Sequence, residues 1–393
     1  MDGSSGQRQR SHVLIVGGGV AGLEAALALH DLADDRVEIE MCAPRRDFVY
    51  RPFAVGEPYG AAQIFRYDLQ LLAGRCGASF RPDSVVSVDG DRRRAATHDG
   101  EEIPYDYLLV ASGARMLWAV PGAVTFWGVA DEGGVGEVVR ELREGRLRRV
   151  LFTMPSGSSW ALPVYELALL AATMLAKAGV SGARLTVVTP ENAPLELFGR
   201  RAGEQMGRLL AEHGVEVMAG THPVKFEDGH LRVAPGKAIE ADAVVTLPRL
   251  EGRPIAGVPH DQEGFVRVDE HGRVPDMERV FAAGDVTAFP VKQGGIATQH
   301  ADTAAEAIAA ELGAQVEARP FDPILRGVLW TGREPRYLYG RLTGGHGETS
   351  TLSEEPPWSP HEGKIIGRYL TPFLESIDGD GGRAPALRSA SAR

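Results

Sequence analysis

Cysteine is scarce in this 393-residue sequence, which contains only Cys42 and Cys76. Two cysteines this far apart exclude a disulfide framework and a CxxC metal site. Cys42 is predicted at the end of a buried strand and Cys76 in a helix–strand turn, where inert packing is the simpler role and redox activity the alternative. The 11 histidines show no HxxxH or HxH spacing, so we expect no metal site.

Positive charge, long apolar runs and an N-terminal signal segment are missing as well. The net charge is −11 at pH 7, which disfavours binding to nucleic acid and to anionic lipid. No apolar run reaches membrane-spanning length, and residues 1–10 lack the apolar stretch of a signal peptide. We therefore expect a cytoplasmic protein, with peripheral attachment to the inner face of the membrane as the weaker alternative.

What is present is an alternation of short apolar strands with helices, which begins at residue 12 and begins again near residue 149. This pattern predicts an α/β fold class, with two Rossmann-like domains, the second inserted in the first, and a small α+β C-terminal domain. Predicted boundaries are 10–125 and 250–318 for the first domain, 126–249 for the second, 319–377 for the third and 378–393 for a disordered tail. Predicted strands include 12–16, 37–42, 107–111, 150–154, 185–189, 215–218 and 280–283, and predicted helices include 20–32, 163–178, 203–213 and 295–312.

A glycine-rich loop follows the first predicted strand and consists of Gly17, Gly18, Gly19, Val20, Ala21 and Gly22. In such a loop the first glycine of the GxGxxG pattern permits the tight turn, the second lets a pyrophosphate approach the backbone, and the third lets the helix pack on the strand. The helix N-terminus adds partial positive charge towards the phosphates. The sequence therefore predicts a dinucleotide site.

The acid that commonly holds the ribose hydroxyls is missing from the end of the second predicted strand. Ala43, Pro44 and Arg45 occupy that place, and Glu40 lies three residues early, in mid-strand. Backbone groups near Ala43 or a neighbouring side chain could compensate. For Arg45, a solvated loop and a ribose or phosphate contact remain equal alternatives.

Three further segments make the case for FAD. Ala111, Ser112 and Gly113 end a predicted strand, Gly284 and Asp285 end another, and Lys292, Gln293 and Gly294 precede a predicted helix. With the first loop, these segments resemble the pyridine nucleotide–disulfide oxidoreductase superfamily over residues 12–312. The resemblance implies an FAD-binding first domain and an NAD(P)-binding-like second domain.

The resemblance also implies roles for individual residues. Asp285 would accept a hydrogen bond from the ribityl chain, and Lys292 would add charge near the flavin N1, unless it is a surface lysine. Val85 would contact adenine through its backbone, or it is a plain strand residue. Residues 48–56, with Arg51, resemble the flavin-side loop of the sulfide:quinone oxidoreductase and type II NADH dehydrogenase branch.

The sequence departs from that branch where its chemistry needs sulfur. Trp160 stands where sulfide:quinone oxidoreductases carry a cysteine, and there is no CxxxxC pair. The second domain lacks GxGxxG, so NAD(P)H binding in the standard mode is doubtful. Ser156, Ser158 and Ser159 could cradle phosphate or cap the following helix.

Two features near the predicted site remain open. Glu166 either approaches the nicotinamide or flavin or only complements the helix dipole. Residues 364–374 form a mildly amphipathic stretch that resembles the C-terminal helix of the branch, which can touch a membrane or line a quinone pocket. A docking helix or a homodimer contact is the alternative.

The function predicted from these features is an FAD-dependent oxidoreductase that passes electrons from an unidentified donor through flavin to a quinone or small redox acceptor. Its candidate catalytic residues are Lys292, Trp160 and Glu166. One alternative is a flavin-binding interaction or redox-sensing protein with little turnover. The other is an NAD(P)H dehydrogenase or ferredoxin-reductase-like enzyme.

Overall fold

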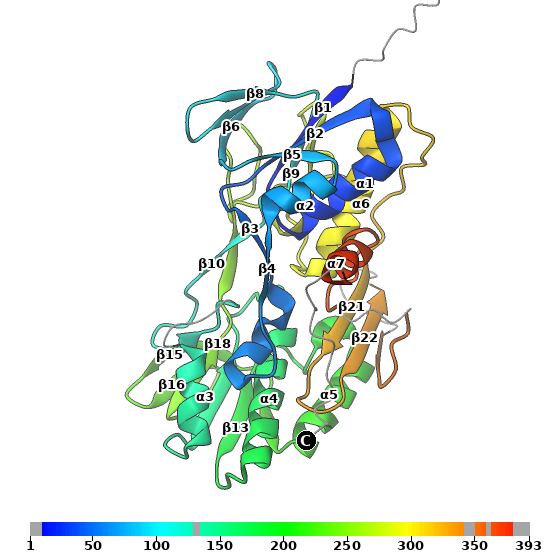
Figure 1. Ribbon diagram of the computed structural model, residues 1–393. Coiled ribbons are helices and arrows are strands. Elements are labelled where there is room, and N and C mark those ends of the chain that lie inside the picture. Colours follow the sequence, from blue (N-terminus) through cyan, green and yellow to red (C-terminus); the bar gives the residue numbers. More distant parts are fainter. Residues whose placement is uncertain (1–9, 129–133, 342–349, 359–362, 380–393) are drawn as a thin grey trace, which may run out of the picture.

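The computed structural model describes residues 10–128, 134–341, 350–358 and 363–379 and contains two parallel sheets of five strands (Figure 1). The first sheet has the order β20-β9-β1-β2-β5 and the second has the order β11-β18-β12-β13-β14. Every neighbouring pair in both sheets is parallel. The strands of the first sheet are β1 (Ser11–Val16), β2 (Val37–Cys42), β5 (Ala78–Arg81), β9 (Tyr107–Val110) and β20 (Val280–Ala282). Those of the second are β11 (Val124–Thr125), β12 (Arg149–Thr153), β13 (Arg184–Val188), β14 (Val215–Met218) and β18 (Ala243–Thr246).

The first unit is built on strand β1, where Val13, Leu14 and Ile15 have no exposed surface. A strand this apolar on both faces needs cover on both sides, as in other parallel sheets. Helices α1 (Val20–Ala33) and α6 (Gly294–Glu311) pack against each other on one face. Their buried alanines, such as Ala25 and Ala304, allow this close approach.

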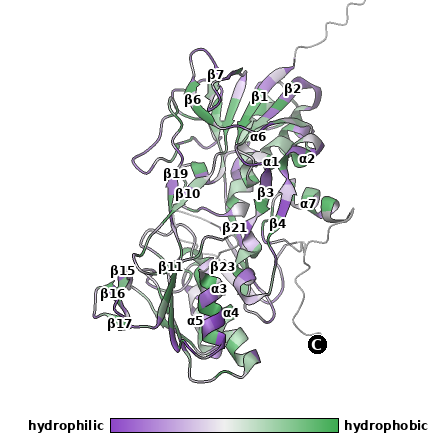
Figure 2. Cartoon of the chain, turned by 60° about the vertical axis from the view of Figure 1, so that its left-hand side comes forward, coloured by the Kyte–Doolittle hydropathy of each residue, from purple (hydrophilic) through white to green (hydrophobic). Residues whose placement is uncertain are grey.

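The second unit repeats this plan around β12. Its helices are α3 (Val135–Arg143), α4 (Leu162–Ala178) and α5 (Arg200–Glu212). Helix α4 buries most of its length in the core, whereas α3 buries one face and exposes the other, as its mixed colours indicate (Figure 2). The predicted α/β class with two Rossmann-like units is confirmed.

Two antiparallel strands join the units. β10 (Ala114–Leu117) leads into the second unit and β19 (Arg249–Gly252) returns from it, with Met116 opposite Leu250. The second unit is therefore inserted in the first, as predicted.

The C-terminal region adds an antiparallel sheet and one helix. The sheet consists of β21 (Ile324–Leu329), β22 (Arg336–Arg341) and β23 (Ser350–Ser353), and it contacts helices of both units. Helix α7 (Leu370–Gly379) packs on α1. The predicted tail beyond it, residues 380–393, lies outside the described residues.

The prediction of a helical stretch from residue 364 is wrong, because α7 begins at Leu370. The amides of Lys364 and Ile365 donate to the Tyr50 hydroxyl, and the amide of Gly367 donates to Thr371 Oγ1. These tertiary bonds replace the helical ones, so this segment is an irregular strap against the first unit.

The remaining elements connect or flank the two large sheets. They comprise the β3–β4 hairpin (Asp47–Tyr50 and Phe65–Asp68), η2 (Arg51–Tyr59), α2 (Leu69–Arg75), the β6-β7-β8 sheet (Val85–Asp89, Arg94–Thr97 and Glu102–Pro104), the β15-β16-β17 sheet (His222–Glu227, His230–Ala234 and Ile239–Glu240) and the 3-10 turns η1 (Asp34–Arg36), η3 (Glu196–Phe198) and η4 (Gly284–Val286). Within the described ranges, no helix is both long and apolar enough to cross a membrane. Those ranges also hold no cluster of three His, Cys, Asp or Glu residues suited to a metal ion.

Candidate functional site

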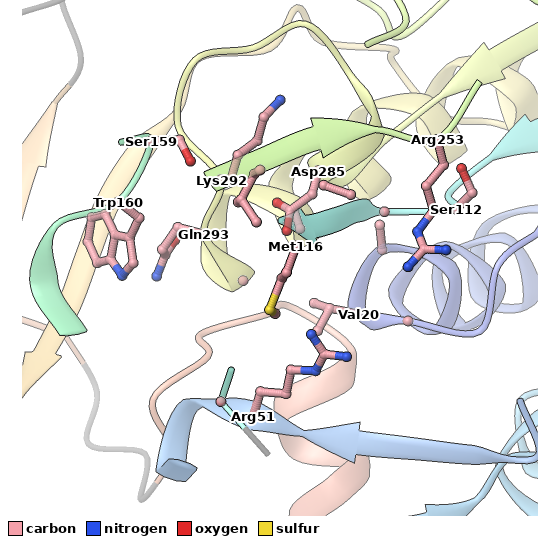
Figure 3. Close-up of a pocket in the computed structure, with 18 of the residues that line it drawn as sticks. Val20, Arg51, Ser112, Met116, Ser159, Trp160, Arg253, Asp285, Lys292 and Gln293 are labelled. Atoms are coloured by element: carbon pink, nitrogen blue, oxygen red, sulfur yellow. The ribbon is translucent and has the colours of Figure 1, made fainter. Parts of the chain in front are cut away.

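A cavity of about 900 Å³ connects the carboxyl ends of the first sheet with the second unit and the C-terminal strap. This volume is at the large end of the range for ligand pockets in proteins. Trp160 and Ser159 lie at one end, Ser112 and Arg253 at the other, and Met116 and Asp285 between them (Figure 3). The cavity is thus long enough in one direction to suit an extended ligand.

The first glycine loop forms one wall of the cavity, and the three glycines of its GxGxxG pattern have different roles. A Cβ on Gly17, whose φ is +124°, would lie 2.2 Å from the Ala111 carbonyl oxygen, and one on Gly22 would lie 2.0 Å from the Gly17 oxygen. A Cβ on Gly19 would meet nothing within 4 Å. Gly17 and Gly22 are therefore required by the fold, whereas Gly19 leaves open space in the cavity. Gly18, Val20 and Ala21 line it too.

The start of helix α1 faces this open space. Gly19 is its N-cap and provides no side-chain hydrogen bond, so the first amides of the helix have no cap from that residue. Uncapped amides and the helix dipole together attract an anion.

The ends of two neighbouring strands contribute the next groups. After β9, Ala111, Ser112 and Gly113 line the cavity, and the buried Ser112 Oγ has no hydrogen-bond partner among the described residues. After β20, Gly284 turns the chain with a φ of +78°, and Asp285 follows it into the cavity. Burial raises the pKa of Asp285, although nearby Lys292 and Arg51 oppose this shift.

The start of helix α6 forms the adjoining wall with Gln293 and Gly294. Gln293 caps the helix by accepting from the Ile296 amide and is tied to β21 by donating to the Arg326 carbonyl. Lys292 lines the cavity but directs its Nζ to the Thr287 carbonyl, 3.9 Å from the centre of the Phe265 ring. Burial lowers the pKa of Lys292 to about 8. Lys292 is thus buried, which rules out a surface lysine.

Residues predicted for the adenosine end line the same cavity, namely Ala43, Pro44, Arg45 and Val85. Glu40 cannot replace the missing acid, because its carboxylate is 2.6 Å from Arg81 Nε and 3.1 Å from His12 Nε2. Arg45 is 3.6 Å from Asp47.

Arg253 and Met116 were not predicted from the sequence, yet they line the cavity from the loop after β19 and from β10. Predicted Arg51 faces Arg253 across it (Figure 3). No local pattern marks Arg253, because only the return of the chain from the second unit brings it here.

In the second unit, the loop after β12 differs from the first loop. Ser158, Ser159 and Trp160 line the cavity, and the Trp160 ring packs on Phe198 with 5.9 Å between ring centres. Helix α4 has Ala161 as its N-cap and no side-chain cap, so the alternative that the serines cap this helix is wrong. Ser156 Oγ is hydrogen-bonded to His222 Nδ1 at 2.8 Å.

The strand that follows, β13, leads to Glu191, an acid near the place where a nucleotide ribose would lie. Its carboxylate is already used by the fold. It accepts hydrogen bonds from the Tyr165 hydroxyl, from Thr189 Oγ1 at 3.1 Å and from the Glu196 amide at 3.0 Å. Glu191 therefore has little capacity left for a ribose.

Glu166 forms a buried ion pair with Lys364 of the strap, with 2.5 Å between Oε1 and Nζ. The same carboxylate accepts from the Trp330 amide at 2.8 Å, and Lys364 Nζ lies 4.9 Å from the centre of the Trp330 ring. Burial raises the pKa of Glu166 and lowers that of Lys364, while their mutual attraction opposes both shifts. Both residues line the cavity, so Glu166 does more than complement a helix dipole.

Both cysteines are buried and free. Cys42 Sγ donates to the Asp83 carbonyl at 3.2 Å, and burial raises its pKa to about 11. Burial likewise raises the pKa of Cys76 to about 12. Thiols with such pKa values are poor nucleophiles near neutral pH.

Comparison with known proteins identifies the wider group. The family model described as pyridine nucleotide-disulphide oxidoreductase matches residues 11–148 and 166–309. Rhodocoxin reductase of Rhodococcus erythropolis is 30% identical over 331 residues, which cover 76% of this chain and 71% of that protein. An NADH dehydrogenase-like protein of Mycobacterium tuberculosis is 25% identical over 298 residues, 71% of this chain and 73% of the relative.

The solved structure of the sulfide:quinone oxidoreductase from Aquifex aeolicus has a similar fold. Its TM-score is 0.79 with 20% sequence identity, and the match covers 94% of this chain and 90% of that one. The family match omits residues 149–165, which contain β12 and the loop through Trp160.

Proposed function

The chain belongs to the pyridine nucleotide-disulphide oxidoreductase family, and we propose that it is an FAD-dependent enzyme whose electron donor is not NAD(P)H bound in the usual second-domain site. The observation that carries this proposal is the continuity of one cavity. One continuous surface joins the glycine loop, Ser112, Asp285 and the start of α6.

The residues present fit FAD. Gly19 leaves space beside the uncapped start of α1, where a diphosphate would be held by backbone amides. The unpartnered Ser112 Oγ and the Asp285 carboxylate suit the hydroxyls of a ribityl chain. Ala43 and Val85 line the adenosine end, and the positive end of α6 at Gly294 faces the ring end.

When bound, FAD supplies two-electron chemistry, and the protein residues orient it and exclude water. The partial positive charge at the start of α6 favours negative charge on the ligand that faces it. Glu166 and Lys364 can hold a proton between Oε1 and Nζ at the cavity wall. An acceptor that takes up protons together with electrons would find a proton source there.

The second unit does not suit a nicotinamide dinucleotide in the standard position. Trp160 stands where a glycine-rich loop would leave room for a diphosphate, and Ser156 is bonded to His222. Glu191 is occupied by Tyr165 and its own loop. These three features support a donor other than NAD(P)H.

A quinone or a small redox protein is the acceptor that we propose. Met116 and Trp160 contribute apolar surface to the cavity, which favours a quinone. The rhodocoxin reductase relative favours a small redox protein only by its name, so we rank that acceptor second. A flavin-binding sensor with little turnover is an alternative to an enzyme with either acceptor.

The test begins with the absorbance spectrum of the purified protein. We expect a flavin spectrum, either as purified or after addition of FAD. The protein is then mixed anaerobically with NADH, NADPH or sulfide, and dithionite serves as the positive control. We expect NADH and NADPH to bleach the flavin absorbance only slowly. No flavin binding would refute the FAD proposal, and rapid bleaching by NADH or NADPH would refute the proposed donor specificity. Bleaching by dithionite alone, with no turnover towards a soluble quinone, would favour the sensor.

A further inference from the structure

Two arginines face each other across the cavity at the glycine loop. Arg51 is the first residue of η2, and Arg253 follows β19. Figure 3 shows the Arg51 guanidinium directed towards Val20 at the start of α1, and the Arg253 guanidinium entering from the opposite wall near Ser112. The segments that carry them are far apart in the sequence, so the fold alone brings them together.

Neither guanidinium has an ion pair or hydrogen bond with any residue that the structure describes. The other arginines that line the cavity are paired, since Arg45 lies 3.6 Å from Asp47 and Arg249 is bonded to Glu251. Arg51 is exposed because it faces the open cavity, yet protein atoms surround it.

This arrangement concentrates positive charge without a counterion. Burial by the surrounding protein lowers the pKa of Arg51. The positive charges of Arg45 and Arg253 lower this pKa further, whereas the charge of Asp285 opposes the shift. An anion that entered the cavity would relieve the repulsion between these guanidinium groups. Arginine also suits phosphate in particular, because its planar fork can bind two oxygens at once.

We propose that Arg51 and Arg253 clamp the diphosphate of FAD from opposite sides of the glycine loop. The clamp compensates for the missing acidic residue that would hold the ribose hydroxyls. Ala43 occupies the place of that acid, and Glu40 does not supply it because it is bound to Arg81 and His12. Affinity for the dinucleotide thus shifts from the ribose to the diphosphate. This inference rests on the proposed function, and its test separates the two.

The test uses the full-length protein freed of flavin and compares Arg51→Gln, Arg253→Gln and the double variant with the wild type. Calorimetry measures the Kd of FAD, ADP and riboflavin. Each single substitution should raise the Kd of FAD and of ADP by roughly 10-fold, and the double substitution should raise both by roughly 100-fold, because charge-assisted contacts to phosphate are lost. Riboflavin, which has no phosphate, should bind all four proteins within twofold of one another.

Arg249→Gln is the matched control, because Arg249 lines the same cavity but is paired with Glu251. It should change the Kd of ADP by less than threefold. Thermal unfolding of each ligand-free variant checks that the fold is kept.

The outcomes separate the clamp from the cofactor. FAD and ADP affinities within twofold of wild type in the double variant would overturn the clamp. So would a loss for FAD that ADP does not share, because it would place the arginines on the flavin. If the wild type binds ADP through both arginines but does not bind FAD, the arginines still form a diphosphate site, whereas the proposed FAD-dependent function fails.

Discussion

The two parallel units share one topology but treat the same loop in opposite ways. After β1, the loop leaves open space at Gly19 beside an uncapped helix. After β12, the corresponding loop brings Trp160 into the cavity and places Ala161 at the N-cap of α4. The fold is thus common to both units, whereas the ability to hold a diphosphate depends on a few loop residues.

The same contrast appears at the strand after each loop. β2 ends beside Ala43, and β13 is followed by Glu191, whose carboxylate is bonded to Tyr165. The family match also omits residues 149–165. In this chain the first unit has an open glycine loop, and residues of the second unit line the same cavity.

The largest effect should come from filling the space in the first loop. Gly19→Val should weaken FAD binding by roughly 1,000-fold, because the new side chain occupies the position of the diphosphate. Stability should be kept, since Gly19 has extended backbone angles and a Cβ there meets nothing within 4 Å. A flavin fluorescence titration measures the loss.

The second loop offers the matched control. Gly157 has a φ of +74° and no neighbour within 4 Å of a Cβ, and Asn tolerates this backbone conformation. Gly157→Asn should leave FAD affinity within twofold of wild type. Equal losses in both variants would mean that the two loops do not differ as described.

A second effect should follow from breaking the ion pair through which the second unit meets the C-terminal strap. Glu166→Gln leaves the buried Lys364 without a counterion and should reduce the free energy of unfolding by about 3 kcal/mol. Urea unfolding measures this change. Lys364→Met combined with Glu166→Gln should restore most of the loss, because no unpaired charge remains. No recovery in the double variant would show that the pair matters for packing and not for charge.

Local patterns predicted the first unit well, because its signals are consecutive in the sequence. Strand β2 has the predicted limits, 37–42, and Gly17, Gly18 and Gly19 connect strand β1 to helix α1, which begins at Val20 as predicted. The GxGxxG spacing can be read from the sequence alone, although the close approach that requires glycine at position 17 involves the distant Ala111.

Contacts between distant segments could not be predicted in this way. Glu166 and Lys364 are 198 positions apart, and no spacing rule connects them. The stretch from residue 364 has apolar residues at helical spacing, yet its backbone amides donate hydrogen bonds to the side chains of Tyr50 and Thr371. Arg253 likewise enters the site only through the return strand β19.

The two units bury a glutamate beside partners of opposite charge. In the second unit Glu166 meets a lysine, whereas in the first unit Glu24 of α1 meets Asp302 of α6. Glu24 also accepts from the amides of Tyr369 and Leu370 at the start of α7. Burial and the Glu24 charge raise the pKa of Asp302 to about 8.

A carboxyl with a raised pKa in the folded state contributes most stability below its unfolded pKa, and this contribution is lost as the pH rises through 8. Asp302→Asn carries no titrating proton at this position. The free energy of unfolding of wild type should therefore fall relative to this variant by up to about 4 kcal/mol from pH 5 to pH 9, since the interval from pH 5 to the folded pKa of about 8 spans about three pH units. Thermal unfolding at both pH values measures this difference. An advantage that does not change with pH would show that Asp302 and Glu24 do not share a proton.

The smallest effect should come from removing the side chain that fills the second loop. Trp160→Ala makes room where a diphosphate would lie, but Glu191 stays bonded to Tyr165 and Ser156 stays bonded to His222. The rate at which NADH reduces the flavin should therefore change by less than about threefold, since room alone supplies no new hydrogen-bonding partner. Stopped-flow reduction under anaerobic conditions measures it, with FAD affinity as the control. An increase of tenfold or more would mean that Trp160 alone closes the second unit, which would then be an obstructed nucleotide site and not only a wall.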